Sequence, residues 1–178
     1  MKKLIFTMAI LLVSTLGFAQ IQKGDIQITG NVGYNKTRPY ITQVVTRETS
    51  RITISSKAGV FLSETTSLGG ILGFSSLKPQ DLTIFNVGAY ARFHKPVVEN
   101  FYLYLEPSFS YGFSNSNGTY DTIDAKLSPG MTYFMSPKFA LDMNSGMIGY
   151  AKNTNGVENY SFNLNLANIT LGASFYIR

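Results

Sequence analysis

Apolar and polar side chains alternate along most of the chain after residue 20. This period of two is typical of β-strands, because successive side chains of a strand point to opposite faces. Eight such segments follow one another, with large apolar residues on one face and mainly Gly, Ser, Thr and Asn on the other. One of the clearest segments sets Phe101, Leu103 and Leu105 against Tyr102 and Tyr104. The pattern therefore predicts an all-β chain with eight strands.

The predicted connections alternate between short and long. Residues 63–65, 96–100 and 136–138 form short turns, whereas the longer, polar links are 36–50, 75–81, 114–122 and 152–159. This alternation predicts an antiparallel up-and-down barrel with both chain ends on the short-turn side. In outer-membrane barrels the short turns face the periplasm and the long loops face outward. The apolar series changes parity before residue 169, which predicts a β-bulge near Ala167 and Asn168.

A soluble barrel would turn the apolar series inward, whereas a membrane barrel turns it toward lipid. The apolar series contains no charged residue and is rich in Phe, Tyr and Met. These bulky side chains would overfill an eight-stranded barrel, whose interior is narrow. We therefore expect this series to face lipid, with Phe85, Leu103, Met131 and Leu171 pointing outward. Pro107 and Pro129 also fall in it, which predicts a bulge or shorter strands there.

The first nineteen residues have the pattern of a secretory signal peptide. Lys2 and Lys3 precede a nearly continuous apolar run over residues 4–16, and Gly17-Phe18-Ala19 offers a cleavage site. The run is shorter than the roughly 20 residues that a membrane-spanning helix needs. We therefore expect residues 1–19 to be removed and residues 20–178 to form the barrel, with the cell outer membrane as its location.

Composition excludes several classes of function. Removing Lys2 and Lys3 leaves 13 of the 15 basic residues against 10 acidic ones, a net charge of +3, too small a bias to indicate nucleic-acid binding. The absence of cysteine excludes disulfides and thiolate metal sites. His94 is the single histidine and lacks an identifiable nucleophile beside it, so we interpret it as an interfacial residue. No catalytic residue, metal site or cofactor is predicted, and the chain is not expected to be an enzyme.

The polar series carries three basic and three acidic residues, which are Lys57, Arg92, Lys126, Glu106, Asp124 and Asp142. Because an unpaired charge inside a barrel is costly, these groups are expected to pair as a network that closes the interior. The alternative is that they form the gate or selectivity element of a small pore.

The outer links supply two further candidate sites. Lys36, Arg38, Arg47 and Arg51 surround the longest link and could contact lipopolysaccharide phosphates, although a solvated loop explains them equally well. Asp121-Thr122-Ile123 matches a short bacterial O-glycosylation pattern on Thr122.

The mature chain resembles the small eight-stranded outer-membrane barrels of the OmpA/OmpX type. The segments that carry the resemblance are residues 66–74 (TSLGGILGF), 128–134 (SPGMTYF) and 171–178 (LGASFYIR). Members usually end on an aromatic residue that the barrel-assembly machinery reads, whereas this sequence ends Tyr176-Ile177-Arg178. The resemblance implies insertion into outer-membrane lipid by that machinery, but no single activity.

We expect a monomer with a structural or surface-interaction role and a closed polar interior. One alternative is a narrow, porin-like channel for small solutes or ions. The other is a soluble secreted or periplasmic barrel that binds an apolar ligand.

Overall fold

The computed structural model describes residues 21–37, 48–79, 81–115, 121–145, 148–154, 156–162 and 169–178. The predicted signal peptide lies outside these residues. None of the described segments is a helix with the length and apolar character needed to cross a bilayer.

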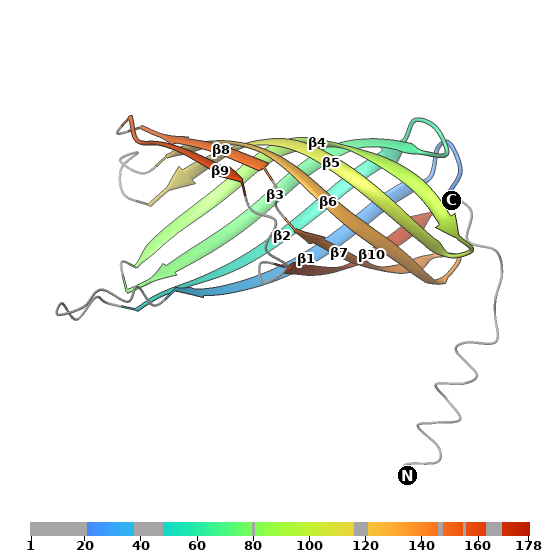
Figure 1. The fold of residues 1–178 in the computed structure, drawn as a ribbon, viewed down its shortest axis with the longest axis horizontal. Helices are drawn as coiled ribbons and strands as arrows, with labels where there is room; N and C mark the ends of the chain where they lie inside the picture. Colours follow the sequence, from blue (N-terminus) through green and yellow to red (C-terminus); the bar gives the residue numbers. More distant parts are fainter. Residues whose placement is uncertain are drawn as a thin grey trace, which may run out of the picture.

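The described residues form ten strands of one antiparallel sheet that closes into an eight-stranded barrel, as predicted (Figure 1). The pairs β7/β8 and β9/β10 each supply one strand of the barrel. Neighbours pair in chain order, and the barrel closes where β1 pairs with β10. The strands are β1 (Ile26–Thr37), β2 (Thr49–Phe61), β3 (Thr66–Lys78), β4 (Leu82–Val98), β5 (Phe101–Ser114), β6 (Thr122–Ser136), β7 (Phe139–Ser145), β8 (Ile148–Asn153), β9 (Glu158–Phe162) and β10 (Ile169–Ile177).

The two ends of the barrel differ in their connections. The inner end carries the turns after β2, β4 and β6, together with the start of β1 and the end of β10 (Figure 1). The outer end carries the links after β1, β3, β5 and β8. The link after β3 is shorter than the predicted 75–81, because β3 continues to Lys78, β4 begins at Leu82, and Leu77 pairs with Leu82.

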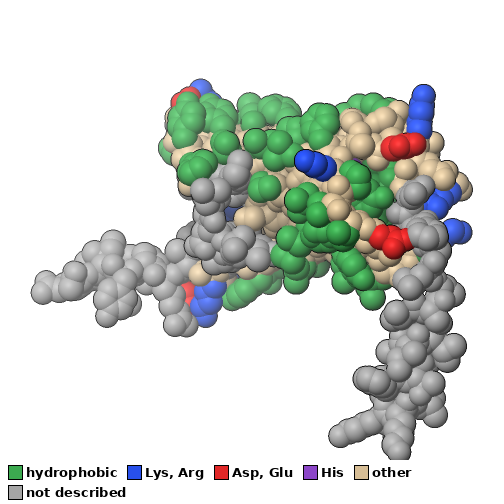
Figure 2. Space-filling model, turned by 45° about the vertical axis from the view of Figure 1, so that its right-hand side comes forward, with side chains coloured by type: hydrophobic (Ala, Val, Ile, Leu, Met, Phe, Trp, Pro, Cys, Tyr) green, Lys and Arg blue, Asp and Glu red, His purple; other side chains and the backbone are tan. Residues whose placement is uncertain are grey.

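The large apolar side chains cover the outside of the barrel. Phe85, Leu103, Met131 and Leu171 are between 36% and 62% exposed, whereas an inward orientation would bury them. Figure 2 shows apolar side chains over the middle of the wall, with most charged side chains toward its two ends. This distribution confirms the predicted orientation of the apolar series and is the one that lipid contact favours.

In two barrel strands, the set of alternate residues that points into the lumen changes part-way along the strand. Leu127 pairs with Ile148 and Gly130 with Asn144, so three residue steps on β6 lie opposite four steps between β7 and β8. The extra residue reverses the parity, which the sequence pattern of this segment did not predict. The change predicted in the last barrel strand is confirmed between β9 and β10, although Ala167 and Asn168 lie outside the described residues.

The two prolines of the apolar series leave the ladder between β5 and β6 regular. Leu105 pairs with Pro129 and Pro107 with Leu127 in a ladder whose register is continuous from Phe101 to Gly112. Pro129 nevertheless lies in the β6 segment from Leu127 to Gly130, opposite which the extra residue between β7 and β8 falls. The predicted irregularity is therefore confirmed at Pro129, whereas the register on both sides of Pro107 is constant and the prediction was wrong there.

Candidate functional site

The inner end of the barrel is filled by an aromatic layer, which consists of Phe61, His94, Tyr102, Phe134 and Tyr176. Each of these side chains is at most 9% exposed. The ring centroids of Phe134 and Tyr176 are 4.8 Å apart, and those of Phe61 and His94 are 5.2 Å apart. His94 is therefore a buried member of this layer, and its interpretation as an interfacial residue was wrong.

The segment before β1 covers the aromatic layer from the inner end. Ile21 is 4% exposed and packs into the same apolar cluster. The Phe61 amide donates to the Asp25 carbonyl over 2.9 Å, and the Gly24 amide donates to the Phe61 carbonyl over 2.8 Å. These bonds hold the segment across the end of the barrel.

Four of the six predicted charged residues lie together in the lumen, on the side of the aromatic layer that faces the outer end. We call this group the ion cluster. Arg92 has no exposed surface; its Nε donates to Glu106 Oε2 over 2.7 Å, and its Nη1 lies 3.3 Å from Asp142 Oδ1. Lys57 forms an ion pair with the other oxygen of Glu106. Two cations thus face two carboxylates, so the ion cluster is neutral as a whole.

Hydroxyl groups that the sequence analysis did not single out complete the ion cluster. Asp142 accepts a hydrogen bond from Thr132 over 2.5 Å and another from Ser174. Gln27 extends this network, since its Nε2 donates to Ser174 Oγ and to the Tyr176 hydroxyl, each over 3.1 Å. The alternation of the sequence could have shown that these side chains point into the lumen. Their contacts, however, depend on the register between β1, β10 and β7.

Tyrosine rings fit into spaces left by glycines around the ion cluster. A side chain at Gly130 would collide with the ring of Tyr104, and one at Gly69 would collide with the ring of Tyr90. Arg92 Cζ lies 4.1 Å from the centroid of Tyr104 and 5.7 Å from that of Tyr90. The two rings thus enclose the guanidinium, and the lumen is filled at this level.

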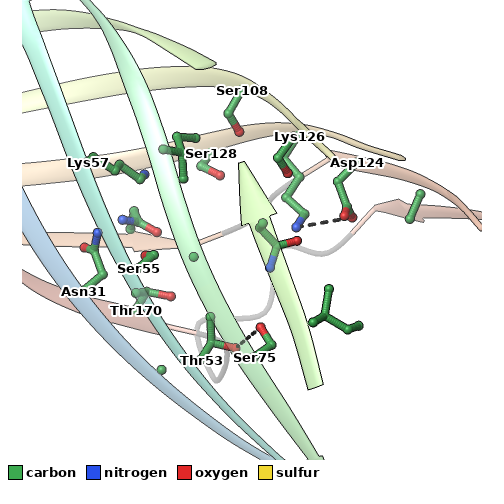
Figure 3. Close-up of a pocket in the computed structure, with 18 of the residues that line it drawn as sticks. Asn31, Thr53, Ser55, Lys57, Ser75, Ser108, Asp124, Lys126, Ser128 and Thr170 are labelled. Atoms are coloured by element: carbon green, nitrogen blue, oxygen red, sulfur yellow. Dashed lines mark hydrogen bonds and ion pairs between the residues drawn. The ribbon is translucent and has the colours of Figure 1, made fainter. Parts of the chain in front are cut away.

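Between the ion cluster and the outer end, the lumen widens into a polar cavity of about 540 Å³, which we call the vestibule. Lys57 and Glu106 form part of its floor, and its walls reach Arg51, Thr122 and Asn159 near the outer end. Figure 3 shows Asn31, Ser55 and Thr170 on one side of the cavity, with Ser108, Ser128 and Lys126 across from them. The vestibule is thus blind, because the ion cluster and the aromatic layer occupy the lumen below it.

The remaining predicted residues line the vestibule or lie at the outer end. Lys126 and Asp124 do not join the ion cluster: they pair with each other over 3.4 Å on the vestibule wall. Arg51 also lines the vestibule, and Thr122 Oγ1 donates to Asp124 over 3.2 Å. Lys36 pairs with Glu48, whereas Arg38 and Arg47 lie outside the described residues.

Neither a family model nor a curated protein sequence matches this chain. Solved structures of other barrels share its fold, among them the following two. The N-terminal β-barrel domain of OprF from Pseudomonas aeruginosa is 14% identical, with a TM-score of 0.55, over 87% of this chain and 98% of that one. The outer membrane protein OprG from Pseudomonas aeruginosa is 12% identical, with a TM-score of 0.51, over 90% of this chain and 94% of that one.

Identities this low carry information about the fold and not about activity. Both matches extend over nearly the whole of the compared barrels. This chain also has the outward apolar belt and the polar lumen that a membrane barrel requires. The chain therefore has the fold of the small barrels found in bacterial outer membranes.

Proposed function

We propose that this protein is a non-enzymatic outer-membrane barrel that does not conduct, with a structural or surface-interaction role. The observation that carries the proposal is the filled inner half of the lumen. Arg92, Glu106 and Asp142 are each at most 2% exposed, and a second filled layer of aromatic rings lies below them. A solute that entered the vestibule would have to break buried ion pairs before reaching the inner end, which is strongly unfavourable.

Conductance across planar lipid bilayers tests the closed lumen. The purified, folded protein is expected to give no steady single-channel openings. A quadruple variant, Arg92→Ser with Lys57→Ser, Glu106→Ser and Asp142→Ser, removes the neutral ion cluster without leaving one of its charges unpaired, and it is expected to leak more. Steady openings of the unchanged protein would instead establish the narrow channel.

Fractionation of the cell envelope tests the location. The protein is expected in the outer-membrane fraction, and its gel migration should differ before and after boiling, as is usual for folded barrels. The soluble-carrier alternative predicts recovery from the periplasmic extract or the medium. The exposed apolar belt favours the membrane location. The vestibule is lined largely by charged and hydroxyl groups, which do not suit the apolar ligand of a soluble carrier.

The partners that follow from this role are outer-membrane lipid around the apolar belt and the barrel-assembly machinery during insertion. Lys36 lies near the outer end of β1 in an ion pair with Glu48, and we extend the proposal to a lipopolysaccharide phosphate contact there. A Lys36→Ser variant should bind lipopolysaccharide micelles more weakly than a Lys138→Ser variant, whose substitution lies at the inner end.

A further inference from the structure

Asn31 is an unusual member of the vestibule lining. It is 4% exposed, yet neither oxygen nor nitrogen of its carboxamide has a hydrogen-bond partner among the described residues. The pairing of β1 with β10 places Gly172 opposite Asn31, and any side chain at Gly172 would collide with Asn31 Oδ1. The fold thus keeps room for a carboxamide that can donate to and accept from one ligand hydroxyl when the side chain turns toward the vestibule.

The floor of the vestibule presents a cation. The Glu106 side chain is 3% exposed and that of Asp142 is fully buried, because Arg92 and neighbouring hydroxyls hold their carboxylates. The Lys57 side chain is 11% exposed and lines the vestibule. An ammonium group has three N–H donors, so the ion pair with Glu106 leaves Lys57 able to donate to a ligand.

The vestibule walls add to this positive bias. Arg51 and Lys126 line the vestibule with one further acid, Asp124. Counting Lys57 and Glu106 as well, three cations face two carboxylates, a net charge of +1, and the buried pair of Arg92 and Asp142 does not change it. Hydroxyl side chains fill much of the rest of the lining, among them Ser55, Ser108, Ser128 and Thr170 (Figure 3).

We infer that the vestibule binds a small hydroxylated anion, of the class of sugar phosphates and sugar acids. The anionic group lies at Lys57 and the hydroxyls lie against Asn31 and the serine-rich wall. The cavity volume of about 540 Å³ falls in the range of ordinary small-molecule sites. The ligand enters from the outer end, since the ion cluster and the aromatic layer fill the lumen below. The site goes beyond the proposed function, because a surface barrel has no requirement for it.

Binding can be measured by NMR titration of the folded, ¹⁵N-labelled protein in detergent micelles with glucose 6-phosphate. The expected result is a saturable shift of the Asn31 side-chain amide signals and of the Ser55 backbone amide signal, which also reports on variants at Asn31. Glucose should bind at least about tenfold more weakly because it lacks the charge. Lys57→Met and Asn31→Leu should each weaken glucose 6-phosphate at least about tenfold.

Two further variants separate a binding site from a folding effect. Lys126→Ser alters a vestibule side chain that is 52% exposed and outside the ion cluster, so the barrel should fold, and binding should weaken severalfold. Lys152→Met removes a lysine on the outer face of β8 and should leave binding unchanged. Gel migration before and after boiling checks that each variant is folded.

The inference is wrong if glucose 6-phosphate gives no saturable shift, if glucose binds equally well, or if Lys152→Met weakens binding as much as Lys126→Ser. These titrations use detergent and measure no conductance. A negative titration would therefore not contradict the proposed closed lumen, and a conducting barrel would not contradict a positive titration.

Discussion

The guanidinium of Arg92 lies over the ring of Tyr104, with its Cζ atom 4.1 Å from the ring centroid. The edge of the guanidinium meets Glu106 and Asp142, so charged partners surround it in its plane while an aromatic ring covers its face. Tyr104 in turn occupies the space above Gly130 on the neighbouring strand. This one contact therefore links the ion cluster to the packing of β5 against β6.

Removing Glu106 should destabilise the barrel strongly. Glu106→Ala leaves Arg92 and Lys57 buried with one carboxylate fewer, and breaking a buried pair in this way costs about 3–5 kcal/mol. Because the chain contains no tryptophan, urea unfolding in phospholipid vesicles is best followed by circular dichroism or gel migration. Glu64→Ala, in the exposed turn after β2, is the matched control and should shift stability by less than about 0.5 kcal/mol. Equal unfolding midpoints for the two variants would exclude an energetic role for the ion cluster.

Two glycines with opposite surroundings test the packing of tyrosine against glycine. Gly130→Ala forces a methyl group into the ring of Tyr104 and should cost about 1–3 kcal/mol. Gly30→Ala meets no atom within 4 Å and should be neutral or slightly stabilising. The same unfolding assay compares them, and a Gly130→Ala variant as stable as Gly30→Ala would contradict the packing described here.

The lipid-facing belt predicts a strong dependence on depth. Leu72 lies at the centre of β3 and is 65% exposed, so Leu72→Arg should lower stability in vesicles by about 2–4 kcal/mol. Leu62 is 51% exposed but follows the inner end of β2, and Leu62→Arg should cost no more than about 1 kcal/mol. If Leu72→Arg were harmless, the outer face would be in contact with water instead of lipid.

Asp121 should make the outer end of β5 sensitive to acid. The Ser114 amide donates to its Oδ1 over 2.8 Å, and this bond, followed by hydrogen bonds from the Tyr111 and Ser114 hydroxyls, lowers the pKa of the Asp121 carboxyl. The charged form accepts these bonds, so the contact is complete above the usual aspartate pKa of about 3.9 and is lost as the pH falls through the lower folded value.

The amide chemical shift of Ser114 reports this titration in micelles. It should change with an apparent pKa below the usual aspartate value, and the change should disappear in Asp121→Asn. A midpoint at or above about 3.9 would show that the carboxylate is not held by these donors.

The parts of the fold that depend on one strand at a time were predictable from the sequence. Phe85 and Leu171 face outward because a period of two assigns the side of the sheet directly, and the narrow lumen required the charges inside it to pair. Lys126 and Asp124 share that inward parity, but they lie nearer the outer end than the ion cluster. Parity gives the face of a residue, whereas its height and partners depend on the stagger between strands.

The aromatic layer was not predicted for a related reason. Phe61 and Phe134 have the inward parity of their strands, but parity does not show that their rings meet those of His94 and Tyr176 at one level of the lumen. The reversal between β7 and β8 was equally hidden, because one extra residue changes the face of every later side chain. The tyrosine contacts join residues on different strands, so no local pattern marks them.

The pairing of β1 with β10 has a consequence for how the barrel forms. Gln27 and Ser174, which are hydrogen-bonded across this pair, lie 147 residues apart in the chain. Contacts of such long range form slowly, because the loop-closure entropy must be lost before they contribute. Until they form, the sheet has two unsatisfied borders that could recruit strands from other molecules. Protecting those borders during biogenesis is thus the step on which a correctly closed cylinder depends.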